Sequence, residues 1–517
     1  MDREDNTEPN RWQKLLASAF AFLTSRNGTG TLFSIILHAF ILVILSLIMI
    51  SRQGSLTGFD TLIGFNVPGA DIAPALLSPT EDKSNDTGTP LQEIEVTEPE
   101  SPTPETDTHP TAAVEADPSV DVSVEPRLQL PTIGGFVSGG GFTDRTPAGR
   151  QRAMQRGDSS QWGEAAVDAA LEWFVTHQQE DGGWSLHHND NGFCRCSHSG
   201  TSPSNRRTAA TALALLSFLG AGHSHQTEGR YKLVVEKGLR FLIRDPNGGI
   251  DSRVVDRDLL QMYSHGLASM ALCEAYAMSR EQNPKSELGL AAQKSLRLIE
   301  TAQDWEFGGW NYRPDQRFRN ESGESVRVGG DTSIFAWQLM ALKSGKIGGL
   351  NVSPSALYLA QDFLDSVALE GGRHYQYLPT GGWDWRRGDD SPQTCTAIGL
   401  LSRMYLGWKP GDPFLDDGID HVAQWGYILR EDRVNLYYIY YATLALHHYG
   451  GDHWEAWNSG LQDMLVQSQV RGGGCESGSW YFRDAYGDVG GRLLNTALAV
   501  MILETPYRFM PLYREIR

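Results

Sequence analysis

The chain has few cysteines, no basic stripe and no excess of positive charge, and each shortage excludes a class of protein. Its 517 residues include only five cysteines, a small and odd number that excludes a disulfide scaffold and leaves the redox compartment open. Asp and Glu outnumber Lys and Arg by 63 to 44, which gives a formal net charge of −19. Because nucleic-acid binding requires a basic surface that releases counterions from phosphates, we predict no nucleic-acid partner.

Formal charge is also missing from one stretch near the N-terminus. Thr31 to Ile50 reads TLFSIILHAFILVILSLIMI, and about twenty such residues are long enough to cross the hydrocarbon core of a bilayer. Four Arg and Lys residues precede this stretch and only Arg52 follows it closely, which predicts a cytoplasmic segment at 1–30. We therefore expect a transmembrane helix at 31–50, in a single-pass protein of the bacterial inner membrane whose C-terminal domain is periplasmic. A cleaved signal peptide and a buried hydrophobic hairpin are the alternatives.

Helical periodicity is absent from the next hundred or so residues. Residues 93–109 read EIEVTEPESPTPETDTH, which is rich in Pro, Thr and acidic side chains. Such a composition buries too little apolar surface to offset the conformational entropy of folding. We expect 51–160 to be a disordered or irregular acidic linker, and 161–517 to be one folded domain.

Short glycine–tryptophan corners recur through this domain. They read QQEDGGW at 178–184, EFGGW at 306–310 and LPTGGW at 378–383, with looser copies at 247–250 and 471–480. Each corner follows an amphipathic helical pattern and precedes a more uniformly apolar one, so it joins the two helices of a repeating pair. At such positions we expect the tryptophans to anchor the turns by packing.

Six amphipathic patterns alternate with six apolar ones. We expect outer helices at 164–177, 231–243, 288–302, 354–366, 416–429 and 454–469. We expect inner helices at 207–221, 261–278, 331–342, 392–405, 436–449 and 493–504. An apolar helix needs cover on all sides and an amphipathic helix on one, so six pairs can close as two concentric rings. The predicted fold class is all-α, as an (α/α)6 toroid.

The corners, the six pairs and two inner segments resemble the prenyltransferase and squalene-cyclase repeat superfamily of terpenoid cyclase-like proteins. These segments are GDTSIFAWQLMAL at 330–342 and QTCTAIGLL at 393–401. The segments at 436–451 and 490–513 are similar to membrane-anchored members from planctomycete-type bacteria. The resemblance implies a toroid that binds an apolar, isoprenoid-like molecule or serves as a scaffold.

The resemblance also implies where catalytic residues would lie. Cyclases of this superfamily carry Asp-x-Asp-Asp, and the nearest segments here keep Asp331 alone and the pair Asp389 and Asp390, which are the candidate catalytic acids. Prenyltransferase zinc ligands correspond to Gln393, Cys395 and Tyr438, so we predict neither that zinc site nor any other cofactor. The alternative to a binding protein or scaffold is a terpenoid cyclase-like enzyme that uses the residual aspartates.

Aromatic residues at the starts of inner helices, together with Cys395, are the candidate ligand-cavity residues, with ordinary interior packing as the alternative. The set consists of His265, Cys395, Tyr437, Tyr438, Tyr440 and Tyr441.

Two cysteine-containing segments remain. CRCSH at 194–198 lies near His187 and His188 and could bind zinc or close a loop, but its one-residue gap is not a usual zinc spacing and favours a structural loop. GCE at 474–476 is similar to the thioester motif of complement-type toroids, yet Gly478 stands where that motif needs glutamine. We predict no metal ligand and no thioester, and the sequence leaves the oligomeric state open.

Overall fold

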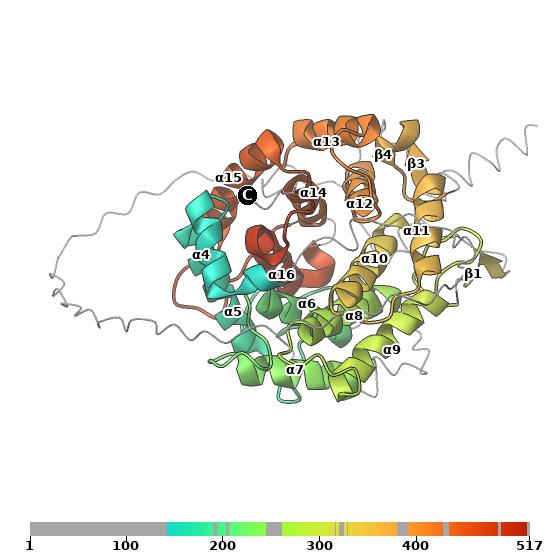
Figure 1. Cartoon of the computed structure of the whole chain (residues 1–517). Coiled ribbons are helices and arrows are strands. Elements are labelled where there is room, and N and C mark those ends of the chain that lie inside the picture. The colour runs from blue at the N-terminus through green and yellow to red at the C-terminus, as the bar shows by residue number, and fades with distance from the viewer. Residues whose placement is uncertain are drawn as a thin grey trace, which may run out of the picture. The chain divides into compact units, whose positions relative to one another are not determined.

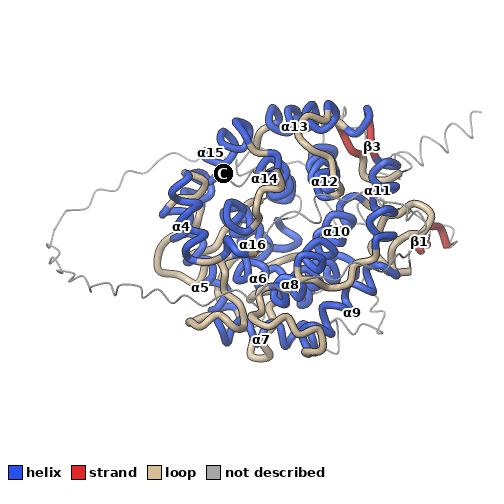
Figure 2. Tube along the Cα trace, in the orientation of Figure 1, coloured by secondary structure: helices blue, strands red, loops and turns tan. Residues whose placement is uncertain are grey.

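The computed structural model of the chain describes residues 142–189, 194–202, 206–244, 261–315, 317–319, 325–327, 329–379, 391–427, 434–483 and 487–513. These ranges contain thirteen α-helices and two pairs of very short strands, which confirms the all-α class (Figures 1 and 2). The expected linker up to residue 141, Asp389 and Asp390 lie outside the described residues.

The expected localisation has to be corrected. Among the described residues, none of the helices combines the length and the apolar character needed to span a bilayer. The 22-residue α16 (Gly487–Arg508), for example, contains Asp488, Arg492, Glu504 and Arg508, and charges within a membrane span are costly. A single-pass inner-membrane protein with a periplasmic domain is therefore not supported. The predicted span at 31–50 itself lies outside the described residues.

All twelve predicted helices of the repeat domain are present and in the predicted order. The outer helices are α5 (Gln161–His177), α7 (Lys232–Arg244), α9 (Glu287–Thr301), α11 (Pro354–Val367), α13 (Pro413–Trp425) and α15 (Gly451–Ser468). The inner helices are α6 (Arg207–Gly220), α8 (Gln261–Ala277), α10 (Thr332–Ile347), α12 (Ser391–Tyr405), α14 (Leu436–Tyr449) and α16.

The inner helices touch one another in a closed cycle. Contacts run from α6 through α8, α10, α12 and α14 to α16, and α16 in turn contacts α6. The outer helices pack against them from outside, and α15 of the last pair contacts α5 of the first (Figure 1). Burial follows this arrangement, because α6 buries thirteen of its 14 residues whereas α7 buries five of its 13. The alternating apolar and amphipathic patterns thus reflect two layers of helices.

The glycine–tryptophan corners anchor the helix pairs. The indole rings of Trp184, Trp310 and Trp480 are fully buried. Each Nε1 donates a hydrogen bond to a carbonyl oxygen near the end of the preceding outer helix, at 2.7–2.8 Å. Gly308 shows why the corner needs glycine, since its φ is +76° and a Cβ there would lie 1.7 Å from the carbonyl oxygen of Leu359.

A glutamine after the outer helix links each of these corners to the next pair. Gln178, Gln303 and Gln469 each donate through Nε2 to a glycine carbonyl of their own corner. Each also donates to a carbonyl near the start of another outer helix. These second acceptors are Val234 in α7, Ala356 in α11 and Ala166 in α5, at 2.9, 2.9 and 2.7 Å. The corner at 471–480, which belongs to the sixth helix pair and is called the sixth corner below, therefore meets α5 of the first pair by the same bond that joins consecutive pairs.

One helix before the repeats was not predicted. It is α4 (Pro147–Arg156), which follows the 3-10 turn η1 (Thr143–Arg145). Both ends of α4 have common helix-capping residues. The Thr146 side chain accepts a hydrogen bond from the Gly149 amide, and Gly157 takes a left-handed conformation after the last turn. The antiparallel strand pairs are β1 (Arg317–Arg319) with β2 (Ser325–Arg327), and β3 (Ala368–Leu369) with β4 (His374–Tyr375), the latter joined by the 3-10 turn η2 (Glu370–Gly372).

Buried ion pairs attach η1 to the inner helices. Arg145 Nη1 and Arg508 Nη2 both lie within 2.9 Å of Glu274 Oε2, and Arg508 Nη1 lies 2.9 Å from Glu504 Oε2. Burial raises the pKa of Glu504 to about 8, although Arg508 and Arg145 act in the opposite direction. This cluster connects α8, α16 and the segment before α4.

Candidate functional site

Of the three candidate acids, Asp331 lies within the described residues. It caps the N-terminus of α10. Its Oδ1 accepts hydrogen bonds from the amide and hydroxyl of Ser333, at 2.7 and 2.6 Å, and from the Ile334 amide at 3.3 Å. Burial raises the pKa of Asp331, while hydrogen bonds from Ser333, Tyr377 and Tyr312 act against that rise. The carboxyl group is therefore a helix cap whose protonated form is favoured by burial.

Tyrosines from neighbouring helices surround this cap. The Tyr263 hydroxyl in α8 donates to Ser333 Oγ at 2.6 Å, and the Tyr437 hydroxyl in α14 donates to the Ser333 carbonyl at 3.3 Å. Trp337 Nε1 donates to the Tyr437 hydroxyl at 2.8 Å, and the Trp337 ring stacks on Tyr440 with centroids 5.6 Å apart. The starts of α8, α10 and α14 thus share one buried network.

The candidate ligand-cavity residues divide between two environments. Tyr437, Tyr440 and Tyr441 lie together against Trp337. His265 and Tyr438 instead bond to carbonyl oxygens of outer helices, those of Ser295 at 2.9 Å and Val422 at 3.4 Å. Cys395 is buried in α12. Tyr263, Tyr312, Tyr377 and Trp337 belong to the network around Asp331 but were not singled out from the sequence.

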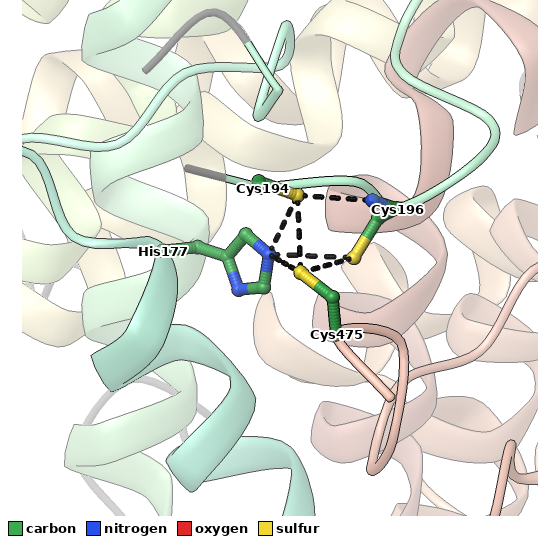
Figure 3. A group of neighbouring side chains, drawn as sticks. All are labelled: His177, Cys194, Cys196 and Cys475. Atoms are coloured by element: carbon green, nitrogen blue, oxygen red, sulfur yellow. Dashed lines mark hydrogen bonds between the residues drawn. The ribbon is translucent and has the colours of Figure 1, made fainter. Parts of the chain in front are cut away.

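Four potential metal ligands meet where the first helix pair adjoins the last. The ligand atoms of His177, Cys194, Cys196 and Cys475 all lie within 4.8 Å of one another. Figure 3 shows the four side chains pointing toward a common centre. His177 ends α5, the two neighbouring cysteines follow the first corner, and Cys475 lies in the sixth corner. The contact between α15 and α5 therefore also brings these side chains together.

The ligand atoms converge from all four side chains. Nε2 of His177 lies 3.0 Å from Cys194 Sγ, 3.4 Å from Cys196 Sγ and 3.5 Å from Cys475 Sγ. Cys475 Sγ lies 3.2 Å from Cys196 Sγ and 3.4 Å from Cys194 Sγ. Four bonds of zinc length in a tetrahedron place neighbouring sulfurs roughly 3.8 Å apart. Small outward movements of these side chains would therefore accommodate one ion.

His177 is oriented for metal binding. Its ring stacks on Trp173 with centroids 4.1 Å apart, and its Nδ1 lies 2.6 Å from the carbonyl oxygen of Trp173. A carbonyl oxygen only accepts hydrogen bonds, so Nδ1 carries the proton and the Nε2 lone pair faces the three sulfurs. Burial also lowers the pKa of His177, which favours the neutral ring that a metal requires.

The thiols supply the rest of a zinc-type donor set. Burial raises the pKa of Cys194 and Cys196, so without a cation these thiols stay protonated. A bound divalent metal would deprotonate them and hold them as thiolates. Three sulfurs and one imidazole nitrogen are a set that suits tetrahedral Zn²⁺, and the side chains present fit such an ion.

This cluster was not predicted from the sequence alone. The one-residue gap between Cys194 and Cys196 is unusual for zinc ligands and favoured a structural loop. Cys475 was considered only as part of a thioester motif. Cys475 is 279 residues from Cys196 along the chain. The predicted closure of six helix pairs places the first and sixth corners side by side. That prediction could have indicated that the cysteines of these two corners lie close together.

Comparisons with known proteins give little further information. No family profile matches the chain, and no curated protein matches it. Among solved structures, the chain is similar to the type II terpene cyclase MstE from Scytonema, with a TM-score of 0.42 and 13% identity over 67% of this chain and 98% of that one. A variant of that enzyme bound to the substrate geranylgeranyl dihydroxybenzoate matches with a TM-score of 0.42 and 12% identity, over 67% and 97%. At such low similarity, chemistry has to be argued from the residues of this chain.

Proposed function

We propose that the chain is a zinc-stabilised helical scaffold of the prenyltransferase and squalene-cyclase repeat type. In this proposal the cycle of inner helices is the inner ring of an (α/α)6 toroid, and one Zn²⁺ joins its first and last helix pairs. The observation that carries it is the convergence of His177, Cys194, Cys196 and Cys475 from the first and sixth pairs. A site with four protein ligands has no open position for substrate, which is typical of structural zinc.

The interior of the described domain also supports a scaffold. Trp337, Tyr440 and Tyr441 pack against one another from α10 and α14 and are almost completely buried. Near the other ends of the inner helices, the ion pairs of Arg145, Glu274 and Arg508 join three elements. These side chains fill space between the inner helices with contacts to each other.

The test is the metal content of the full-length protein, purified without chelators from zinc-supplemented cells. We expect one zinc per chain in the wild type, and a loss of at least tenfold in Cys475→Ser and Cys196→Ser. The matched control is Cys273→Ala, because Cys273 is a buried cysteine of α8 outside the cluster and should leave the zinc content unchanged. Wild-type protein without bound metal would reject the proposal, and so would full zinc retention in Cys475→Ser.

A second candidate function is binding or cyclisation of an apolar, isoprenoid-like molecule, with Asp331 as the acid. One observation favours it, namely a buried carboxyl group whose pKa is raised by burial and which lies among tyrosine hydroxyls. A protonated carboxyl group can donate a proton to an alkene, and aromatic rings can stabilise the resulting cation. We place it second because the same carboxylate caps α10, a structural task that explains its bonds with Ser333 and Ile334.

Extraction of the purified protein with organic solvent, followed by mass analysis, tests this second function. An isoprenoid that co-purifies with the wild type in stoichiometric amounts would support it. The absence of any apolar molecule, together with no turnover of linear isoprenoids by either the wild type or Asp331→Asn, would exclude it.

A further inference from the structure

A buried arginine bridges the two loops that carry the cysteines. Arg492 follows the kink of α16 at Gly491, and only 3% of its side chain is exposed. Its Nε and Nη2 donate to the carbonyl and hydroxyl oxygens of Ser197, at 3.2 and 3.1 Å. Ser197 directly follows Cys196, so the guanidinium group holds the first ligand loop.

The same guanidinium group also holds the sixth corner. Arg492 Nη2 lies 3.0 Å from Glu476 Oε2, and Nη1 donates to Ser479 Oγ at 3.1 Å. Glu476 directly follows Cys475, and its Oε1 accepts a hydrogen bond from the Ser197 amide at 2.6 Å. Arg492, Glu476 and Ser197 thus form a closed set of bonds that fixes the two loops relative to each other.

The charge of the arginine is used within the bridge. Its buried guanidinium group pairs with the Glu476 carboxylate, so a neutral ion pair joins the two ligand loops. Guanidinium groups are suited to this position because several planar donors can bond different acceptors at once.

We propose that Arg492 is a positioning residue of the metal centre, which holds the Cys196 and Cys475 loops at ligand spacing. This inference rests on the proposed zinc site and extends it beyond the four ligands. Residues that orient metal ligands typically change affinity by about 10- to 100-fold when they are replaced.

The experiment measures the zinc dissociation constant of the full-length protein by competition with a chromophoric chelator. We expect Arg492→Gln to raise the dissociation constant by about 10- to 100-fold, and Arg492→Lys, which keeps the charge but loses the planar fork, to give a smaller increase. The matched control is Arg471→Gln in the same corner, since the Arg471 side chain donates to the Val466 carbonyl and should leave affinity within about twofold.

A second readout separates positioning from general stability. Cobalt(II) bound in place of zinc reports ligand geometry through its visible and thiolate charge-transfer bands. We expect these bands to change in Arg492→Gln and to be restored in part by Arg492→Lys. Glu476→Gln gives a further test if Arg492→Gln does not fold, because Glu476 is about one-third exposed and its loss weakens the same bridge.

The outcomes distinguish this inference from the function on which it rests. A wild-type chain that binds no zinc would overturn the proposed function. Wild-type protein with one zinc, combined with unchanged affinity and unchanged cobalt bands in Arg492→Gln and Glu476→Gln, would overturn the role of Arg492 alone.

Discussion

Removal of the metal should lower thermal stability by an amount set by the length of chain that the cluster closes. His177 and Cys475 are 298 residues apart. A metal that stays bound to both restricts a loop of that length in the unfolded chain, which the loop-entropy relation converts to about 6 kcal/mol at 25 °C. For a domain of about 350 residues, with an unfolding entropy of roughly 0.7 kcal/mol/K, the expected decrease in Tm is about 8 °C.

Differential scanning calorimetry of the full-length protein, with zinc and after chelation, measures this decrease. Cys475→Ser should have a low Tm in both conditions, because it lacks the ligand that the sixth corner contributes. Cys273→Ala changes a cysteine outside the cluster and should respond to chelation as the wild type does. An unchanged wild-type Tm after chelation, or an equal decrease in the Tm of Cys475→Ser, would show that the metal does not stabilise the domain through this loop.

Three further predictions concern the fold. Arg145→Ala leaves Glu274 with one buried cation partner fewer and should reduce the free energy of unfolding by about 3–5 kcal/mol in urea titrations; an unchanged midpoint would contradict the role of this ion pair. Since the folded pKa of Glu504 is raised from 4.5 to about 8, the folded state binds the proton more tightly, so wild-type stability should fall as pH rises through that window. Glu504→Gln should flatten this decline, and equal pH slopes would count against it. Gln469→Leu and Gln303→Leu each leave two carbonyls without their donor, and each should reduce the free energy of unfolding by about 2–3 kcal/mol in the same titrations. A negligible reduction for Gln469→Leu alone would show that the sixth corner does not contact the first pair as described.

Hydrophobic periodicity was enough to predict the repeat helices. A helix covered on all sides, such as α6, has an apolar sequence throughout. The sequence of α7 is amphipathic because one face of that helix remains in water. The predicted boundaries differ from the observed ones by a few residues, as in α16, which starts earlier because its first turn precedes the kink at Gly491. The short helix α4 was missed because the surrounding composition resembled the linker, even though Thr146 and Gly157 mark its ends.

The metal cluster was less accessible to sequence reasoning. His177 and Cys475 belong to different helix pairs, and local ligand spacing contains no information about contacts between pairs. Periodicity predicts which face of a helix is buried, but it does not predict which loop side chains meet when the last pair adjoins the first. The bonds of Arg492 with Ser197 and Glu476 follow from that same contact.

X-ray absorption at the zinc edge of the purified full-length protein identifies the atoms bound to the metal. Zinc held by the four side chains gives a first shell of three sulfurs at about 2.3 Å and one nitrogen at about 2.0–2.1 Å. A shell made only of nitrogen and oxygen, or a spectrum without bound zinc, would contradict the proposed site.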